Sequence, residues 1–135
     1  MSNQPHYSVS VSVSVQVNYL PDQSNAEESR FAYAYNVKIT NVGNVAAQLI
    51  SRHWVITDSN GHVQEVKGLG VVGAQPLLNP NQQFEYTSGT VLNTQEGKMH
   101  GSYFFVAVDG TRFEAAIEPF ILAQPADMIK PRVLH

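Results

Sequence analysis

Residues 8–17 read SVSVSVSVQV, and this stretch decides the fold class. Valine occupies every odd position from Val9 to Val17, and serine or glutamine occupies every even position between them. Successive side chains of a β-strand point to opposite faces, so a period of two is typical of a strand with one buried and one exposed face. The stretch therefore predicts a strand whose valines face a core.

The same alternation extends along the rest of the chain. A second strand is expected over 31–39, where every odd position carries an aromatic or β-branched residue. Asn60-Gly61 predicts a type I′ hairpin turn, because that turn needs positive φ angles, and Asp109-Gly110 marks a second hairpin. No segment has a convincing helical period, and the best candidate, 25–29, is too short. Runs rich in β-branched and aromatic residues predict further strands at 46–58, 62–67, 83–87, 102–108 and 112–117.

About seven strands joined by Gly, Pro and Asn turns predict an all-β fold, a two-sheet β-sandwich of the immunoglobulin or fibronectin III type. A small closed barrel is the alternative. The 135 residues fit one domain over 1–135, with its core at about 7–124. Irregular structure is expected at 1–6 and at 122–135, the latter because its prolines oppose regular pairing. Trp54 has the spacing of a core residue.

Composition narrows the classes of function. The chain has no cysteine, which excludes disulfides, thiol catalysis and thiolate metal sites. Its net charge is −3 with Lys and Arg scattered singly, so no nucleic-acid partner is expected. No apolar stretch approaches the roughly 20 residues of a membrane helix, and the first residues do not read as a signal peptide. We therefore expect a soluble cytoplasmic protein without a membrane partner.

The segment Gly68-Leu69-Gly70-Val71-Val72-Gly73 matches the letters of the dinucleotide-binding fingerprint. That fingerprint needs a helix that starts at the loop, because its amides and dipole hold pyrophosphate. Residues 74–80 contain two prolines and cannot form such a helix, and no acidic residue follows at the required distance. The segment therefore predicts a tight connection between sheets. Its consecutive amides would still suit an anion without any helix.

The polar side chains give little support to catalysis. No nucleophile, base and orienting residue can be named together, so no enzymatic activity is expected. None of the five histidines has the spacing of a metal pair, and no metal or cofactor is expected. His53 and His62 flank the Asn60-Gly61 turn at similar distances and would approach each other across the hairpin. The alternative is two partly exposed strand residues.

The first strand has the properties of a binding edge. In a fibronectin-like sandwich the opening strand lies at a sheet edge, where one row of N–H and C=O groups lacks a partner. Residues 1–20 contain no Asp, Glu, Lys or Arg, and a slip of two residues keeps valine inward. We expect this edge to add a strand from a second copy of the chain or from a partner protein, unless loops or the C-terminal tail cover it. The side chains expected to point outward are Ser8, Ser10, Ser12 and Ser14.

Several short motifs follow one another along the chain. They are RHWVITD at 52–58, the glycine segment at 68–73, FEYTSG at 84–89, GKMHGSY at 97–103 and IEPF at 117–120. Together, from residue 9 to about 124, they resemble the ApaG family. The resemblance implies a fibronectin III-like sandwich.

The resemblance also implies a loosely defined function. Bacterial members are linked to cobalt and magnesium tolerance or efflux. Related domains look like interaction modules in F-box proteins and in a polymerase-interacting protein. The family's glycine motif, suggested as a pyrophosphate site, corresponds here to Gly68, Gly70 and Gly73. We therefore expect first a protein-interaction module, and second a sensor that binds a nucleotide polyphosphate at 68–73.

Overall fold

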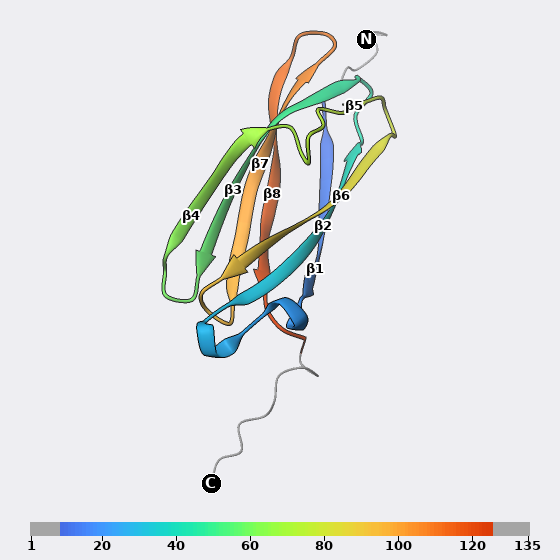
Figure 1. Ribbon diagram of the computed structural model, residues 1–135. Coiled ribbons are helices and arrows are strands. Elements are labelled where there is room, and N and C mark those ends of the chain that lie inside the picture. The colour runs from blue at the N-terminus through green and yellow to red at the C-terminus, as the bar shows by residue number, and fades with distance from the viewer. Residues whose placement is uncertain (1–8, 126–135) are drawn as a thin grey trace.

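A computed structural model describes residues 9–125 (Figure 1). Two three-residue 3₁₀ turns, η1 (Pro21–Gln23) and η2 (Ala26–Glu28), connect the first two strands, and the described residues contain no α-helix. The predicted all-β class is confirmed. The strands are β1 (Val11–Tyr19), β2 (Phe31–Asn41), β3 (Ala47–Asp58), β4 (Val63–Leu69), β5 (Leu77–Leu78), β6 (Gln83–Leu92), β7 (Gly97–Ala107) and β8 (Arg112–Leu122).

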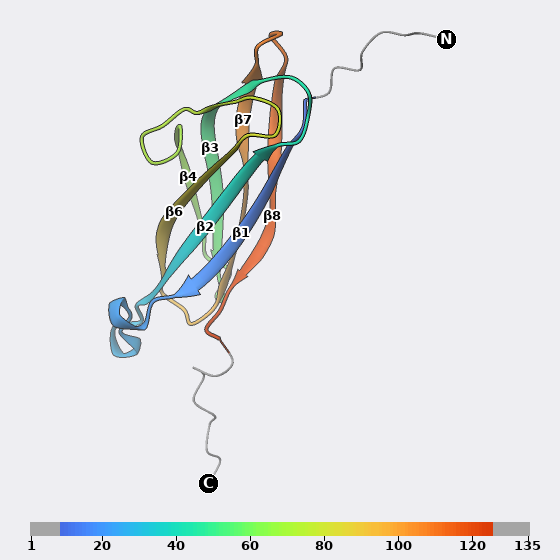
Figure 2. The same cartoon turned by 90° about the vertical axis from the view of Figure 1, so that its right-hand side faces the viewer.

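The strands form two antiparallel sheets that face each other (Figures 1 and 2). One sheet has the order β1-β2-β6, and the other has the order β4-β3-β7-β8 with β5 paired to β3. No ladder joins the two sheets in the described part of the chain. The architecture is therefore the predicted β-sandwich. It is not the closed barrel, which was the alternative prediction.

The core lies between the sheets, and the period-two pattern decides which side chains enter it. Along β2, Tyr33, Val37 and Ile39 are all 0% exposed. Trp54 of β3 is 2% exposed, so its predicted core position is confirmed. The valines of β1 are half-buried and pack against the same cluster, as their alternation predicts.

Several strands differ from expectation through pairing that the local sequence does not show. β6, expected over 83–87, continues to Leu92 because it pairs with β2 as far as Phe31. β5 adds an eighth strand of two residues, too short for any periodic signal. β7 begins at Gly97 instead of Ser102, because Asp58 of β3 continues to pair with it. β8 runs through Pro119 to Leu122, one residue into the segment expected to be irregular. Pro119 is tolerated because β8 is an edge strand whose register shifts beside it.

The Asn60-Gly61 hairpin is present, but the predicted type I′ turn is wrong. Gly61 has φ 81°, whereas Asn60 is not among the residues with positive φ. Gly61 N–H donates to Asp58 O, and the Asp58 carboxylate accepts from the N–H groups of Asn60 and His62 at 2.9 Å each. This side chain stabilises a type I turn followed by a left-handed glycine. Asp109-Gly110 also forms its predicted hairpin, with Gly110 at φ 90°.

Candidate functional site

β1 is the terminal strand of its sheet and has one unpaired edge. Leu20 N–H donates to Ala32 O at 2.9 Å, and Ser10 O accepts from Val42 N–H at 3.0 Å. Even-numbered residues therefore bond to β2. Since amides alternate in direction along a strand, the odd-numbered residues direct their N–H and C=O groups away from β2. Within the described residues β2 is the strand paired with β1.

The side chains of β1 separate into two faces. Ser12 and Ser14 are exposed, as is Ser10, which lies one residue before the strand. Ser8 lies outside the described residues. The opposite face packs against β8 of the other sheet, and Figure 2 shows the two strands running beside each other. The edge is thus uncharged, regular in register and backed by a core.

Gly68 and Gly70 have close neighbours that favour glycine, and Gly70 and Gly73 have a positive φ angle that favours it. A β-carbon on Gly68 would lie 2.8 Å from the guanidinium of Arg52. Gly70 has φ 65°, and a β-carbon there would lie 2.3 Å from Ala74 O. Gly73 has φ 81° and, with Val72 at φ 42°, forms the turn that returns Ala74 to Val71. No helix starts at the loop, because Leu77–Leu78 is a strand.

Arg52 holds this loop in place by hydrogen bonds, a role that no local pattern in the sequence indicates. Its Nη1 donates to Leu69 O at 3.0 Å and to Gly70 O at 2.9 Å. The loop therefore presents carbonyl groups to the nearest cation. Leu69 and Val72 are 74% and 62% exposed, so the outer surface of the loop is apolar.

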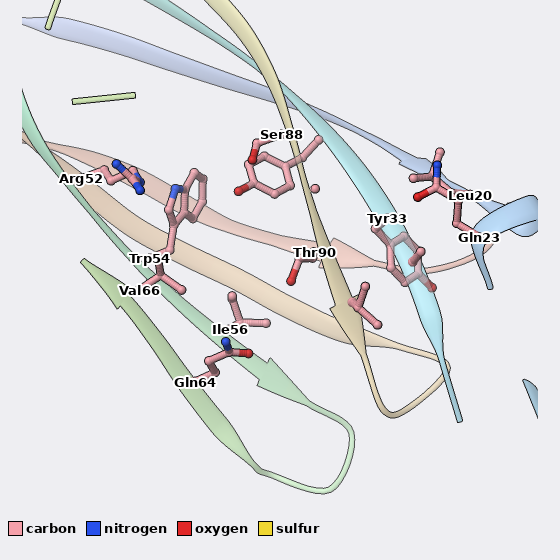
Figure 3. A pocket seen from close by; sticks show the side chains of 14 residues that line it. Leu20, Gln23, Tyr33, Arg52, Trp54, Ile56, Gln64, Val66, Ser88 and Thr90 are labelled. Carbon is pink, nitrogen blue, oxygen red and sulfur yellow. The ribbon is translucent and has the colours of Figure 1, made fainter. Parts of the chain in front are cut away.

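A cleft of about 510 Å³ opens between the sheets on the side where β4 and β6 are the terminal strands. Figure 3 shows Arg52 at one end of this β4–β6 cleft, and Leu20 and Gln23 at the other. The lining combines aromatic and aliphatic side chains with small polar ones. Among the lining residues are Tyr35, Arg52, Trp54, Ile56, Gln64, Val66, Ser88 and Thr90.

Two buried tyrosines lie near the aromatic residues of the cleft, since the rings of Trp54 and Tyr103 are 6.2 Å apart between centroids. The hydroxyls of Tyr86 and Tyr103 share a short hydrogen bond. Burial raises the pKa of Tyr86 to about 12, and the positive charge of Arg52 acts in the opposite direction. Burial also raises the pKa of Tyr103. Both phenols are neutral at physiological pH and hold the two sheets together by a polar contact inside the core.

The two histidines beside the first hairpin do not meet. His53 lies opposite Lys67 in the β3–β4 ladder, and its Nε2 is 3.0 Å from a carboxylate oxygen of Glu65. His62 belongs to the turn, next to Val63. The alternative prediction was that both histidines are partly exposed strand residues. It holds for His53, whereas His62 is exposed and lies just before β4. Among residues 9–125 no three His, Asp or Glu side chains gather as metal ligands would.

The fold and its surfaces define a class: a two-sheet antiparallel β-sandwich with an uncharged edge strand and a cleft between its sheets. The model of the ApaG domain matches residues 21–107. The chain belongs to the ApaG family. Within the described residues no helix has the length and apolarity needed to cross a bilayer.

Relatives from several bacteria support this assignment over at least 90% of the chain. Protein ApaG of Acidovorax sp. (strain JS42) is 55% identical over 136 residues, 97% of this chain and 99% of its own. Protein ApaG of Methylobacillus flagellatus is 56% identical and covers 92% of this chain and 93% of its own. A crystal structure described as the ApaA protein of Bordetella pertussis has a TM-score of 0.87 at 50% identity, over 90% of this chain and 99% of that one. These names state a family and no reaction.

Proposed function

We propose that this protein is a non-enzymatic cytoplasmic binding module that adds a strand of a protein partner to the free edge of β1. The observation that carries the proposal is the outward row of N–H and C=O groups on the odd-numbered residues of Val11–Val17. Main-chain hydrogen bonds supply the affinity when a strand adds to a sheet. β1 carries no charge that would oppose such an addition.

The partner that we propose first is another copy of the same chain, which would make the protein a homodimer. An antiparallel pairing of β1 with itself is two-fold symmetric, as most homodimer interfaces are. Shifting the register by two residues along Val11–Val17 still opposes valine to valine. The repeat therefore tolerates several registers. In each of them the outward N–H and C=O groups of β1 find hydrogen-bond partners.

Amide hydrogen exchange tests this edge residue by residue. In the monomer, the amides of Ser12 and Ser14 are bonded to β2 and exchange slowly, whereas those of Val13 and Val15 exchange fast. If β1 pairs with a second copy, the valine amides become protected as the protein concentration rises. Fast exchange of both valine amides at every concentration where a dimer exists would place the interface elsewhere.

Lysine substitutions provide a second test. We expect Ser10→Lys with Ser12→Lys to weaken dimerisation at least about tenfold, because the edge of each copy then carries two positive charges that oppose the addition of a strand. The matched control is Gln83→Lys with Thr87→Lys, which puts two exposed lysines on β6, at the other edge of the same sheet. Equal association of both variants in sedimentation experiments would contradict the β1 interface.

A nucleotide polyphosphate at 68–73 is the second candidate. One observation favours it: within the described residues, the N–H groups of Val72 and Gly73 have no protein acceptor. Titrating ATP into ¹⁵N-labelled protein should shift these two amide signals before others. If ATP moves neither signal, the loop is left with the steric roles described above.

We also propose that any link to cobalt or magnesium tolerance runs through the protein partner. The one ion pair of residues 9–125, His53–Glu65, offers two ligand side chains on an exposed face. Dedicated transition-metal sites use more convergent ligands. Calorimetric titration of the untagged protein should therefore give no stoichiometric binding of Co²⁺ or Mg²⁺, and stoichiometric binding would contradict the proposal.

A further inference from the structure

We propose that the β4–β6 cleft binds a small, flat carboxylic acid whose carboxylate is held by Arg52. The cleft has the size of small-molecule sites, which range from about 300 to 1,000 Å³. Arg52 lies at one end of it, and Leu20 and Gln23 lie at the other (Figure 3). A site of this size suits a compact ligand better than a continuous peptide strand.

Arg52 is a cation without a counter-ion. A guanidinium carries five N–H donors, and here Nη1 uses its two on the carbonyls of Leu69 and Gly70. Within residues 9–125, Nε and Nη2 have no protein acceptor and no carboxylate pairs with Arg52. A partly buried charge with three remaining donors favours an anionic ligand, because the anion replaces lost hydration.

The number of charges in the cleft favours a carboxylate over a phosphate. Arg52 is the one charged side chain in its lining. A carboxylate carries a single negative charge and two oxygens that match the fork of a guanidinium. A phosphate monoester carries nearly two negative charges at neutral pH and would remain under-neutralised beside one arginine.

The side chains at the base of the cleft favour a particular shape for the part of the ligand that does not carry the carboxylate. The rings of Tyr35 and Trp54 lie 5.2 Å apart between centroids, with Ile56 and Val66 beside them. Facing sheets of a sandwich are about 10 Å apart, so the space between them admits a thin group more easily than a branched one. An aromatic or other planar apolar body gains contact with these side chains, while Ser88 and Thr90 supply hydroxyls at the wall.

Trp54 makes the proposal directly measurable. It is the one tryptophan of the chain, so its indole N–H gives one identifiable signal in a ¹H–¹⁵N correlation spectrum. We would titrate two matched pairs, benzoate with benzamide and indole-3-acetate with indole-3-acetamide, into the full-length protein. Each acid should shift the Trp54 signal saturably and bind at least about tenfold more tightly than its amide, because charge-assisted hydrogen bonds to a guanidinium exceed neutral ones.

A charge-matched pair of variants isolates Arg52. Arg52→Gln should abolish the preference for acid over amide, whereas Lys67→Gln, which removes an exposed cation of β4, should retain it. Because Arg52 also fastens the 68–73 loop, the melting temperature of each variant is measured first. If Arg52→Gln does not fold, Ser88→Phe tests the site with Arg52 intact, since a phenyl group there fills the cleft and should abolish the Trp54 shift.

Three results would overturn the proposal. One is the absence of a saturable Trp54 shift with both acids. Another is equal affinity for acid and amide. The third is tighter binding of AMP than of either carboxylate. None of these results bears on β1, whose test is amide exchange along Val11–Val17, so the two proposals fail separately.

Discussion

The two open sides of the sandwich differ in how the sheets approach each other. On one side β1 packs against β8, and its inward side chains are the valines at 11, 13, 15 and 17. On the other side β6 places Ser88 and Thr90 opposite β4, and the β4–β6 cleft remains. The two sides share one architecture, so the volume of a few edge side chains decides whether a sandwich closes or keeps a cavity.

The difference also separates two modes of binding. The β1 side offers backbone groups on a filled edge, which suits another strand. The β4–β6 side offers side chains around a space, which suits a small molecule. Four changes would break or sharpen this contrast, taken from the largest expected effect to the smallest.

Gly70→Ala should damage the cleft side most. The new β-carbon would lie 2.3 Å from Ala74 O at a residue with φ 65°, so the loop that Arg52 holds must shift. We expect a loss of about 2–4 kcal/mol in the free energy of unfolding, measured by urea denaturation. Gly73→Ala is the control, because its β-carbon meets nothing within 4 Å and its φ of 81° alone costs about 1 kcal/mol. Equal losses in the two variants would show that the contact with Ala74 is unimportant.

Alkaline pH should weaken the core near the cleft. The pKa of Tyr86 is raised from 10.0 to about 12 by burial, so the folded state favours the neutral phenol. Its contribution to stability is therefore complete below pH 10.0 and is lost as the pH rises towards about 12. We expect a loss on the order of 2 kcal/mol over this range, from about 1.4 kcal/mol per unit. Phenolate absorbance that appears before unfolding, with unchanged stability, would contradict it.

Val15→Ser should open the closed side. Val15 is a half-buried inward residue of β1, and serine removes apolar volume between β1 and β8. We expect a loss of about 1–2 kcal/mol in unfolding free energy. Ser14→Ala, on the exposed face of the same strand, should change it by less than about 0.5 kcal/mol. A similar loss in both variants would mean that burial at β1 is not what closes this side.

Ser88→Val should have the smallest effect and the opposite sign. Valine adds apolar volume to the wall of the cleft at a half-buried position of β6 and favours strand structure. We expect a gain of less than about 1 kcal/mol in the free energy of unfolding, measured by urea denaturation. A loss comparable to that of Val15→Ser would show that the cleft is too rigid to accept a methyl group.

Side-chain alternation predicted the fold well because it is a local property. The valines of β1 and the buried position of Trp54 follow from a period of two. The hairpin turn at Asn60-Gly61 was placed correctly, but its type depends on the Asp58 carboxylate, a side chain outside the dipeptide. Leu77–Leu78 forms a strand only because β3 lies beside it.

The cleft could not be predicted from the sequence, for a different physical reason. Alternation assigns Ser88 and Val66 to inner faces, but it does not say that their strands oppose each other or how much space remains. Leu20, at the far end, is 32 residues before Arg52 in sequence. Arg52 itself lies within the family motif at 52–58, yet its role depends on the carbonyls of Leu69 and Gly70.

The packing of Arg52 over Gly68 should couple the two positions in evolution. A β-carbon at 68 would lie 2.8 Å from guanidinium nitrogens, so any larger residue there displaces the arginine. In relatives that keep Arg52, position 68 should remain glycine. In relatives that replace Arg52, a larger residue can occupy position 68. Substitutions at the two positions should therefore arise together among relatives, although the residues stand sixteen positions apart in the chain.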